Sequence, residues 1–375
     1  MRASNAKPLA GLFVVAVEQA VAAPYCSSRL ADAGARVIKI ERPEGDFARG
    51  YDDVAAGQSS YFVWLNRGKE SLVVDLASEA GRATLGALLA KADVLIQNLK
   101  PGALARLGFA PEALRLSHPR MVICSISGYG ETGPMADRKA YDLLIQAESG
   151  LSSITGGPSE PARVGISIVD IATGSIAHAA IMEALLARGL TGEGADIRVS
   201  MFDVMAEWLA VPLLHQEAGK PPGRIGLAHP SISPYGVFST RDGKSVLISI
   251  QSDREWRKLC EAFLQRPEAA RDARFATNVA RVAHRAETDG LVGAVFARLD
   301  EAEAKIRLIR ADVAFASVNE MADLSRHPHL RRITVDSPAG PVQLPAPAAI
   351  FNGAPRRYGA VPALGEHRPL GEPRK

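Results

Sequence analysis

The stretch that decides the fold is "LFVVAVEQAVAAPYCSSRLADAGARVIKIE", Leu12 to Glu41. It begins with a short apolar run, continues with a segment whose apolar residues recur at helical spacing, and closes with a second apolar run. The two runs predict buried strands, and the middle segment predicts a helix between them. A strand, a helix and a strand in this order are typical of a parallel sheet, because parallel neighbours need a crossover connection.

The same alternation continues to about residue 130. Further strands are predicted for "SLVVDL", "DVLIQNL" and "MVICSISGYG", and further helices for "EAGRATLGALLAKA", "ALARLGF" and "PEALRLSHP". The strand-like runs do not alternate cleanly between apolar and polar residues, as expected for strands that are buried on both faces. We therefore predict an α/β fold whose large domain is a doubly wound parallel sheet covered by helices on both faces.

A second, smaller domain is predicted in the last third of the chain. The segment "KPPGRIGLAHPSISPYG" interrupts the periodicity with prolines and glycines, which indicates a domain boundary. "GVFSTRDGKSVLISI" after it predicts a β-hairpin that turns at Asp242-Gly243, and two helical stretches follow. We expect a large domain at 1–200 completed by 335–375, a small α+β domain at 225–325, and linkers at 201–224 and 326–334.

The composition narrows the function classes. With a formal net charge of +3 and no basic block, the chain does not look like a nucleic-acid-binding protein, but a few arginines and lysines could hold an anionic small molecule. The three cysteines are far apart and form no CxxC pair, so we expect free thiols, no metal site and a cytoplasmic protein. No apolar run predicts a membrane span.

One carboxylate stands out in "VGISIVDIATG", Val164 to Gly174. We predict a strand for "GISIV" and a helix for the segment that follows, which places Asp170 at their junction. Asp170 could be the N-cap of that helix, the commonest use of such an aspartate. It could equally be a reactive carboxylate whose pKa is set by its apolar surroundings. The stretch alone leaves both interpretations open.

Seven motifs in series carry a resemblance to a known family. They are "VIKIERPEGDFAR", "NRGKESLVVDL", "DVLIQNLKPGALARLGF", "SISGYGETGP", "KAYDLLIQAESG", "VGISIVDIATG" and "GADIRVSMFDV". In this order and at these spacings the chain resembles the class III coenzyme A transferases, a family that includes formyl-CoA transferase, carnitine CoA transferase and α-methylacyl-CoA racemase. The resemblance implies a large and a small domain joined by two linkers, and an intertwined homodimer in which two chains are threaded like linked rings. It also implies acyl-CoA and a small carboxylic acid as substrates, with no permanently bound cofactor.

The resemblance assigns roles to individual residues. Asp170 matches the family's nucleophile, which forms an acyl–aspartyl anhydride and then an aspartyl–CoA thioester. Gln19 matches the first loop, which packs near the thioester. The other positions that match CoA contacts are Arg42, Arg106, Lys139 and Tyr141. Without the family, the cations among them would be interpreted as solvated surface residues and Tyr141 as a core or domain-edge aromatic.

The identity of the acid substrate is predicted from positions at which this chain differs from particular members of the family. Formyl-CoA transferase carries His and Gln in the first loop where this chain has Gln19 and Val21, so formyl-specific chemistry is not expected. "LAHPSISPYG" resembles the members that act on short dicarboxylates, and the glycine run of formyl- and oxalate-directed members is missing. We expect a dicarboxylate of four to six carbons, with succinyl-CoA as donor. The candidates for binding its far carboxylate are Arg163, Arg224 and His229.

Two other functions remain as alternatives. An α-methylacyl-CoA racemase needs two bases that flank the α-carbon, and the family's racemases pair their aspartate with a histidine. The matching triplet here is "AYD", so Tyr141 stands in that place, and a phenol with a pKa near 10 is a poor base at neutral pH. A non-catalytic acyl-CoA binder is the third possibility, against which the presence of Asp170 argues.

Overall fold

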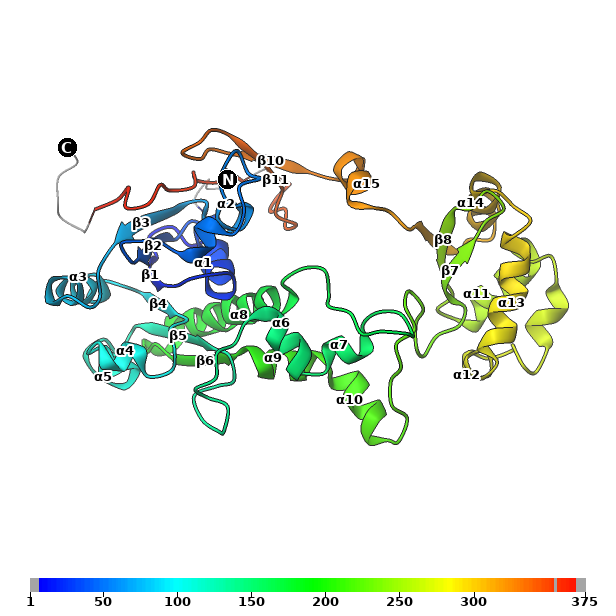
Figure 1. Ribbon diagram of the computed structural model, residues 1–375, viewed down its shortest axis with the longest axis horizontal. Coiled ribbons are helices and arrows are strands. Elements are labelled where there is room, and N and C mark those ends of the chain that lie inside the picture. The colour runs from blue at the N-terminus through cyan, green and yellow to red at the C-terminus, as the bar shows by residue number, and fades with distance from the viewer. Residues whose placement is uncertain (1–6, 354–355, 369–375) are drawn as a thin grey trace. The chain divides into compact units, whose positions relative to one another are not determined.

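The computed structural model describes residues 7–353 and 356–368, which form two compact units (Figure 1). The first unit consists of the described parts of Met1–Leu151, Arg163–Val211 and Arg331–Lys375. The second consists of Ser152–Ala162 and Pro212–Leu330.

The first unit is built on a six-stranded parallel sheet with the order β3-β2-β1-β4-β5-β6. Its strands are β1 (Phe13–Val17), β2 (Arg36–Glu41), β3 (Lys69–Val73), β4 (Val94–Gln97), β5 (Val122–Ser127) and β6 (Asp196–Ser200). Every neighbouring pair is parallel, with Val14 of β1 opposite Val37 of β2 on one side and opposite Val94 of β4 on the other. The predicted large parallel sheet is confirmed.

Helices cover both faces of this sheet, and the central strands β1 and β4 are apolar on both sides. Alternate residues of β1 enter different cores: Val14 and Ala16 pack with α1 and α8, whereas Val15 and Val17 pack with α3. The helical segments between β1 and β7 are α1 (Ala22–Asp32), η1 (Phe47–Gly50), α2 (Ser60–Asn66), α3 (Glu79–Leu89), α4 (Ala103–Arg106), α5 (Pro111–Ser117), α6 (Asp142–Glu148), α7 (Leu151–Ile154), α8 (Ile168–Thr191), α9 (Met201–Trp208) and α10 (Ala210–Glu217). Residues 201–224, expected from the sequence to be a linker, thus contain α9 and α10.

Helix α8 has the length and composition of a membrane span, which the sequence did not predict. In the first unit, however, its buried residues, among them Val169, Ala177 and Ile181, pack against the sheet and against α1. This packing is that of a core helix.

The chain returns to the first unit near its C-terminal end. A two-stranded antiparallel sheet of β10 (Arg332–Val335) and β11 (Val342–Pro345) follows the second unit in sequence. Val335 and Val361 pack with Phe62 and Val63 of α2, and the backbone N–H of Gly68 donates to the carbonyl of Ala360 at 2.7 Å.

The second unit contains a three-stranded antiparallel sheet of order β7-β8-β9, formed by β7 (Tyr235–Ser239), β8 (Ser245–Ser249) and β9 (Ala314–Ser317). The hairpin predicted at Asp242-Gly243 joins β7 to β8, and Gly243 has φ of +75°. The other elements are α11 (Asp253–Lys258), a π-helical turn (Leu259–Phe263), η3 (Pro267–Arg271), α12 (Asn278–Ala283), α13 (Arg285–Phe296), α14 (Glu301–Arg310) and α15 (Met321–Arg326). Trp256, Phe263 and Phe296 fill the core of this unit.

Candidate active site

The strand order places a crevice in the first unit. β1 lies between β2 and β4, so the connections that follow β1 and β4 leave the sheet in opposite directions. In doubly wound sheets the ligand site lies outside the carboxyl ends of the strands at such a switch point. A cavity of about 520 Å³ is found there, and the segments that follow β1 (Gln19–Ala22) and β4 (Asn98–Pro101) line it.

Asp170 lines this cavity, but not from the junction that the sequence predicted. Residues 165–167 do not form a strand, and α8 begins at Ile168, so Asp170 lies in the first turn of a helix. The N-cap position belongs to Ser167, and the N-cap interpretation of Asp170 is wrong. Among the described residues no donor is hydrogen-bonded to the Asp170 carboxylate, while the backbone N–H of Asp170 is bonded at 3.3 Å.

A second carboxylate performs the capping. Asp142, the first residue of α6, is buried, and its Oδ1 accepts from the backbone N–H groups of Val169 at 2.8 Å and Asp170 at 3.3 Å. Its Oδ2 accepts from Gln146 Nε2 at 2.7 Å. The Asp142 side chain thus accepts hydrogen bonds from backbone amides at the start of α8, which have no partner within that helix. Asp170 is left free to face the cavity.

Gly174 sets how closely α8 approaches α1. It lies one helical turn after Asp170, and a Cβ atom at this position would come within 2.4 Å of the Ala22 carbonyl oxygen and 2.9 Å of Tyr25 Cβ. No side chain larger than hydrogen fits without moving the backbone of one helix. The small residues after Asp170 therefore let the first turn of α8 lie beside the loop that follows β1.

The electrostatic environment of Asp170 raises its pKa to about 7. Burial is the main cause and the negative charge of Asp142 is the second. Burial also raises the pKa of Tyr51, another residue of the cavity wall, to about 12, and Asp46 and Asp170 add to the effect. Tyr51 is therefore a neutral hydrogen-bond donor near Asp170 at physiological pH.

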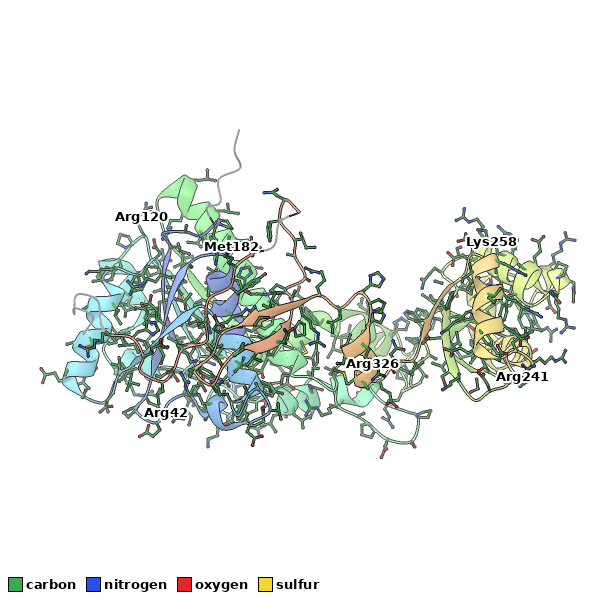
Figure 2. The ribbon with its side chains drawn as sticks, turned by 90° about the horizontal axis from the view of Figure 1, so that it is seen from above. Arg42, Arg120, Met182, Arg241, Lys258 and Arg326 are labelled. Atoms are coloured by element: carbon green, nitrogen blue, oxygen red, sulfur yellow. The ribbon has the colours of Figure 1, made fainter. Side chains whose placement is uncertain are left out.

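Cationic side chains surround the cavity without being neutralised by the protein. Lys100, Arg138, Lys139 and Arg163 line it, and none of them forms an ion pair within the described parts of the chain. A neighbouring cavity of about 290 Å³ shares Gln19 and Leu99 with the first one and is bordered by Arg42. Arg42 is exposed and donates through Nε to the carbonyl of Gly45 at 3.0 Å (Figure 2). Such a row of free cations suits a long, polyanionic ligand.

The structure brings together most of the residues singled out from the sequence. Gln19, Lys139, Tyr141, Arg163 and Asp170 all line the larger cavity, and Arg42 borders the smaller one. Arg106, at the end of α4, is exposed and lines neither cavity.

The other two predicted residues belong to the second unit. The Arg224 guanidinium donates to the carbonyl oxygens of Ser153, Gly157 and Pro158, so it organises a loop of its own unit. The His229 ring stacks on Tyr235 with centroids 5.3 Å apart, and its Nδ1 accepts from the backbone N–H of Ser231. Neither residue lines the cavity in the first unit.

Sequence reasoning missed several residues of this cavity. Asp142 stood within the motif "KAYDLLIQAESG" beside Tyr141, but nothing in a single sequence shows that it would cap another helix. Asn98 and Lys100 follow β4 directly, and their place at the end of a buried strand was the available signal. Tyr51 and Arg138 come from loops, whose position depends on the folded chain. Within the described residues no cluster of His, Cys, Asp and Glu side chains could hold a metal ion.

Comparison with known proteins shows to which family the chain is similar. A family model described as CoA-transferase family III matches residues 9–368. A succinate–glutarate CoA-transferase of Agrobacterium fabrum is 35% identical over 96% of this chain and 94% of that protein. An acetyl-CoA:oxalate CoA-transferase of Acetobacter aceti is 42% identical over 74% of this chain and 72% of that protein.

Solved structures agree with this relationship. The crystal structure of a CAIB/BAIF family protein from Brucella suis is 37% identical to this chain and superposes with a TM-score of 0.80. The similarity covers 96% of this chain and 97% of that one.

Proposed function

The chain belongs to CoA-transferase family III, and we propose that it moves CoA from succinyl-CoA to another short dicarboxylic acid through covalent intermediates on Asp170. The observation that carries this proposal is the position of Asp170. Its carboxylate accepts no hydrogen bond from the described residues, and it faces a cavity whose lining cations form no ion pair with them. Such a carboxylate keeps its lone pairs available for attack on a carbonyl carbon.

The proposed reaction balances without an additional reagent. An oxygen of Asp170 attacks the thioester carbonyl carbon, the C–S bond breaks, and an acyl–aspartyl anhydride and the CoA thiolate result. The thiolate attacks the carbonyl carbon of Asp170, which releases the donor acid as its carboxylate and leaves an aspartyl–CoA thioester. The acceptor carboxylate then attacks this thioester, expelling the thiolate and forming a new anhydride. Attack of the thiolate on the acyl carbon of the acceptor yields the new acyl-CoA and restores Asp170.

The cavity wall supports each step of this scheme. The two adjoining cavities offer a path from Arg42 to Asp170, and the cations Lys100, Arg138 and Lys139 suit the phosphates of CoA. The side-chain amide of Gln19 lies where both cavities meet, and the Tyr51 hydroxyl stays protonated beside Asp170. Both can donate to the oxygen that becomes negative during attack on the thioester.

The choice of a dicarboxylate rests on the relatives and on one cation. One relative is named for succinate and glutarate and another for oxalate, so short diacids are common to both names. Because an oxalate-directed relative is 42% identical, the missing glycine run does not by itself separate oxalate from longer diacids. Arg163 lines the cavity, carries no ion pair within the described residues and is our candidate for binding the second carboxylate.

The covalent step can be tested by mass spectrometry. After incubation with succinyl-CoA and without an acceptor, the intact protein should gain the mass of CoA less one water, on a peptide that contains Asp170. Asp170→Ala should lose this adduct and more than about a thousandfold of turnover. Asp137→Ala, the same substitution at an exposed position, is the matched control. An adduct on another residue, or turnover retained by Asp170→Ala, would contradict the mechanism.

Selectivity is tested with acetyl-CoA as the donor by comparing succinate with butyrate as acceptors, because succinyl-CoA and succinate would give no net transfer. Arg163→Gln should lower kcat/KM for succinate by about thirtyfold or more, because losing the partner of a desolvated charge costs about 2–5 kcal/mol. The value for butyrate should change much less. Arg224→Gln, in the second unit, should leave the ratio unchanged. An equal loss for both acids in Arg163→Gln would remove this residue from the selection of the acid.

We also propose an intertwined homodimer and a cytoplasmic location. Large apolar side chains remain exposed on and after α8, among them Leu190, Trp208, Val211 and Leu214, as expected for a surface that another chain covers. Threaded chains should sediment as a dimer at any dilution, whereas a monomer at low micromolar concentration would contradict this arrangement.

A further inference from the structure

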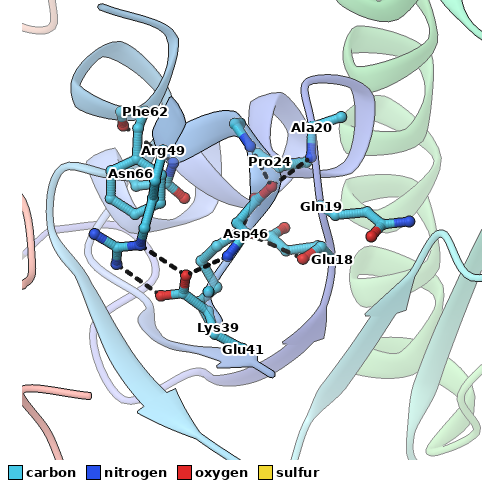
Figure 3. A network of polar contacts seen from close by, with 12 residues as sticks. Glu18, Gln19, Ala20, Pro24, Lys39, Glu41, Asp46, Arg49, Phe62 and Asn66 are labelled. Atoms are coloured by element: carbon cyan, nitrogen blue, oxygen red, sulfur yellow. Dashed lines mark hydrogen bonds and ion pairs between the residues drawn. The ribbon is translucent and has the colours of Figure 1, made fainter. Parts of the chain in front are cut away.

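A buried charged network lies beneath the loop that follows β1 (Figure 3). Lys39 of β2 has a fully buried side chain whose Nζ lies 2.8 Å from Asp46 Oδ2 and donates to the Glu18 backbone carbonyl at 3.3 Å. The Asp46 carboxylate is also fully buried, and its Oδ1 accepts from the backbone N–H groups of Ala20 at 3.2 Å and Ala48 at 2.9 Å. The Lys39–Asp46 ion pair thus holds the backbone of the residue before Gln19 and of the residue after it.

The loop itself is strained at one residue. Ala20 has φ of +62°, in the left-handed region that a residue with a Cβ seldom occupies. A conformation of this kind persists when surrounding contacts impose it. The bond from the Ala20 N–H to Asp46 is such a contact, and Asn98 bonds both backbone groups of Gln19, accepting from its N–H at 3.0 Å and donating to its carbonyl at 2.9 Å.

The consequence is a fixed backbone at Gln19, which sets the direction in which its side chain leaves the loop. That side chain points away from the Lys39–Asp46 pair in Figure 3, and it lines both cavities of the candidate site. We propose that Asp46, held by Lys39, is a positioning residue that acts through the Ala20 N–H and aims the Gln19 amide at the thioester of the bound acyl-CoA. This inference rests on the proposed function. Asp46 borders the smaller cavity, but its carboxylate has no exposed surface and its contacts are all with the protein.

A double-mutant cycle separates this role from a general structural one. Asp46→Asn should lower kcat by about tenfold to a hundredfold, the loss expected from misplacing a group near the reacting atoms, and should change KM for succinyl-CoA much less. In a Gln19→Ala background the same substitution should lower kcat by less than about twofold, because the residue that Asp46 positions is already gone. Losses that multiply in the double variant would overturn the proposal.

The matched control is Asp32→Asn. Asp32 is a buried carboxylate of the same unit paired with Arg67, and it does not contact the loop of residues 18–20. This variant should lower stability while leaving kcat within about twofold of wild type. If it lowers kcat as much as Asp46→Asn, the effect of Asp46 is merely structural and the proposal fails.

Hydrogen exchange gives a readout that does not depend on activity, and its first measurement, on the wild-type protein, needs no variant. In the wild-type protein the Ala20 amide should exchange slowly, because it is bonded to a buried carboxylate. In Asp46→Asn a peptide that covers residues 18–22 should exchange at least about tenfold faster, while peptides around Asp32 should not change. Rapid exchange of Ala20 in the wild type would overturn the proposal. If the wild type transfers no CoA, the proposed function fails and the exchange experiment still decides whether Asp46 holds the loop.

Discussion

Glu18 and Asp170 are both carboxylates of the first unit, and their surroundings move their pKa values in opposite directions. Burial alone would raise the pKa of Glu18, which is fully enclosed, but Lys69 and Lys39 hold it below its usual value. Asp170 is partly exposed, yet none of the cations in the described part of the chain is bonded to it, and burial together with Asp142 raises its pKa to about 7. The degree of burial therefore does not decide in which direction the pKa of a carboxylate moves; the presence of a cationic partner does.

The two carboxylates also change stability in opposite ways as pH changes. The lowered pKa of Glu18 contributes stability that is present above its unfolded pKa and lost as pH falls through the folded value. The raised pKa of Asp170 contributes stability that is present below its unfolded pKa and lost as pH rises toward about 7. Near neutral pH the paired carboxylate stabilises the fold and the unpaired one destabilises it.

The largest effect that tests this comparison is on stability. Glu18→Gln removes the partner of Lys69, whose Nζ lies 2.7 Å from Glu18 Oε1, and should lower the free energy of unfolding by about 3–5 kcal/mol. The pKa of Lys69 is already depressed to about 8, mainly by burial, so the variant should lose less stability at pH 9, where Lys69 can be neutral. Urea unfolding at pH 6 and pH 9 measures both effects.

Glu70→Gln provides the control for this experiment. Glu70 forms an ion pair with Arg36 in the same sheet at 2.7 Å, but both side chains are exposed to solvent, 25% and 45% respectively. Its substitution should change the free energy of unfolding by less than about 1 kcal/mol. Equal losses of unfolding free energy for Glu18→Gln and Glu70→Gln would show that the buried network contributes no more to stability than an exposed ion pair.

The sequence predicted the large sheet because its strands are local apolar runs. "LFVVAV" and "RVIKIE" are short, apolar and separated by one helix, so each could be recognised without knowing its neighbours. The run "GISIV" is also apolar, but its residues 165–167 form no strand and its last two, Ile168 and Val169, begin α8, because Asp142 binds amides at that end of the helix. The contact that fixes the start of this helix joins residues at least 27 positions apart in the sequence. The local pattern of apolar residues carries no information about such a contact.

The residues of the candidate site that could be predicted came mainly from the resemblance to the family. Asp170, Lys139 and Tyr141 lie in the seven motifs, Gln19 lies in the segment that matches the family's first loop, and all four line the cavity. Arg224 and His229 were chosen by their position in the chain, and the structure gives both a local role in the second unit. The buried partners of Asp46 could not be predicted, since Lys39 looks like a surface lysine in an otherwise apolar strand.

A smaller effect is expected from removing the charge of Asp170. Asp170→Asn should stabilise the protein. In the folded state the Asp170 carboxyl lies where ionisation is unfavourable, whereas in the unfolded chain it ionises freely, and a neutral amide does not ionise in either state. The gain should grow by about 2.5 kcal/mol between pH 5 and pH 8, since the penalty rises until the pH reaches the folded pKa and each pKa unit corresponds to about 1.4 kcal/mol. Denaturant unfolding at both pH values measures it. Asp137→Asn should show no such growth, and a pH-independent gain in Asp170→Asn would show that its carboxylate is not perturbed in this way.

The smallest effect concerns Asp142, the second cause of the raised pKa of Asp170. In the proposed reaction Asp170 must be ionised to attack the thioester. The pH profile of kcat/KM for succinyl-CoA should therefore have a rising limb with an apparent pKa near 7. Asp142→Asn removes the neighbouring negative charge and should move this limb to lower pH, whatever it does to the maximal rate. The new amide meets the Gln146 Nε2 donor, so Gln146→Glu is combined with it to restore an acceptor. In the double variant the negative charge lies one helical turn away, and the limb should fall between those of the wild type and Asp142→Asn. An unchanged limb in both variants would show that burial alone raises the pKa of Asp170.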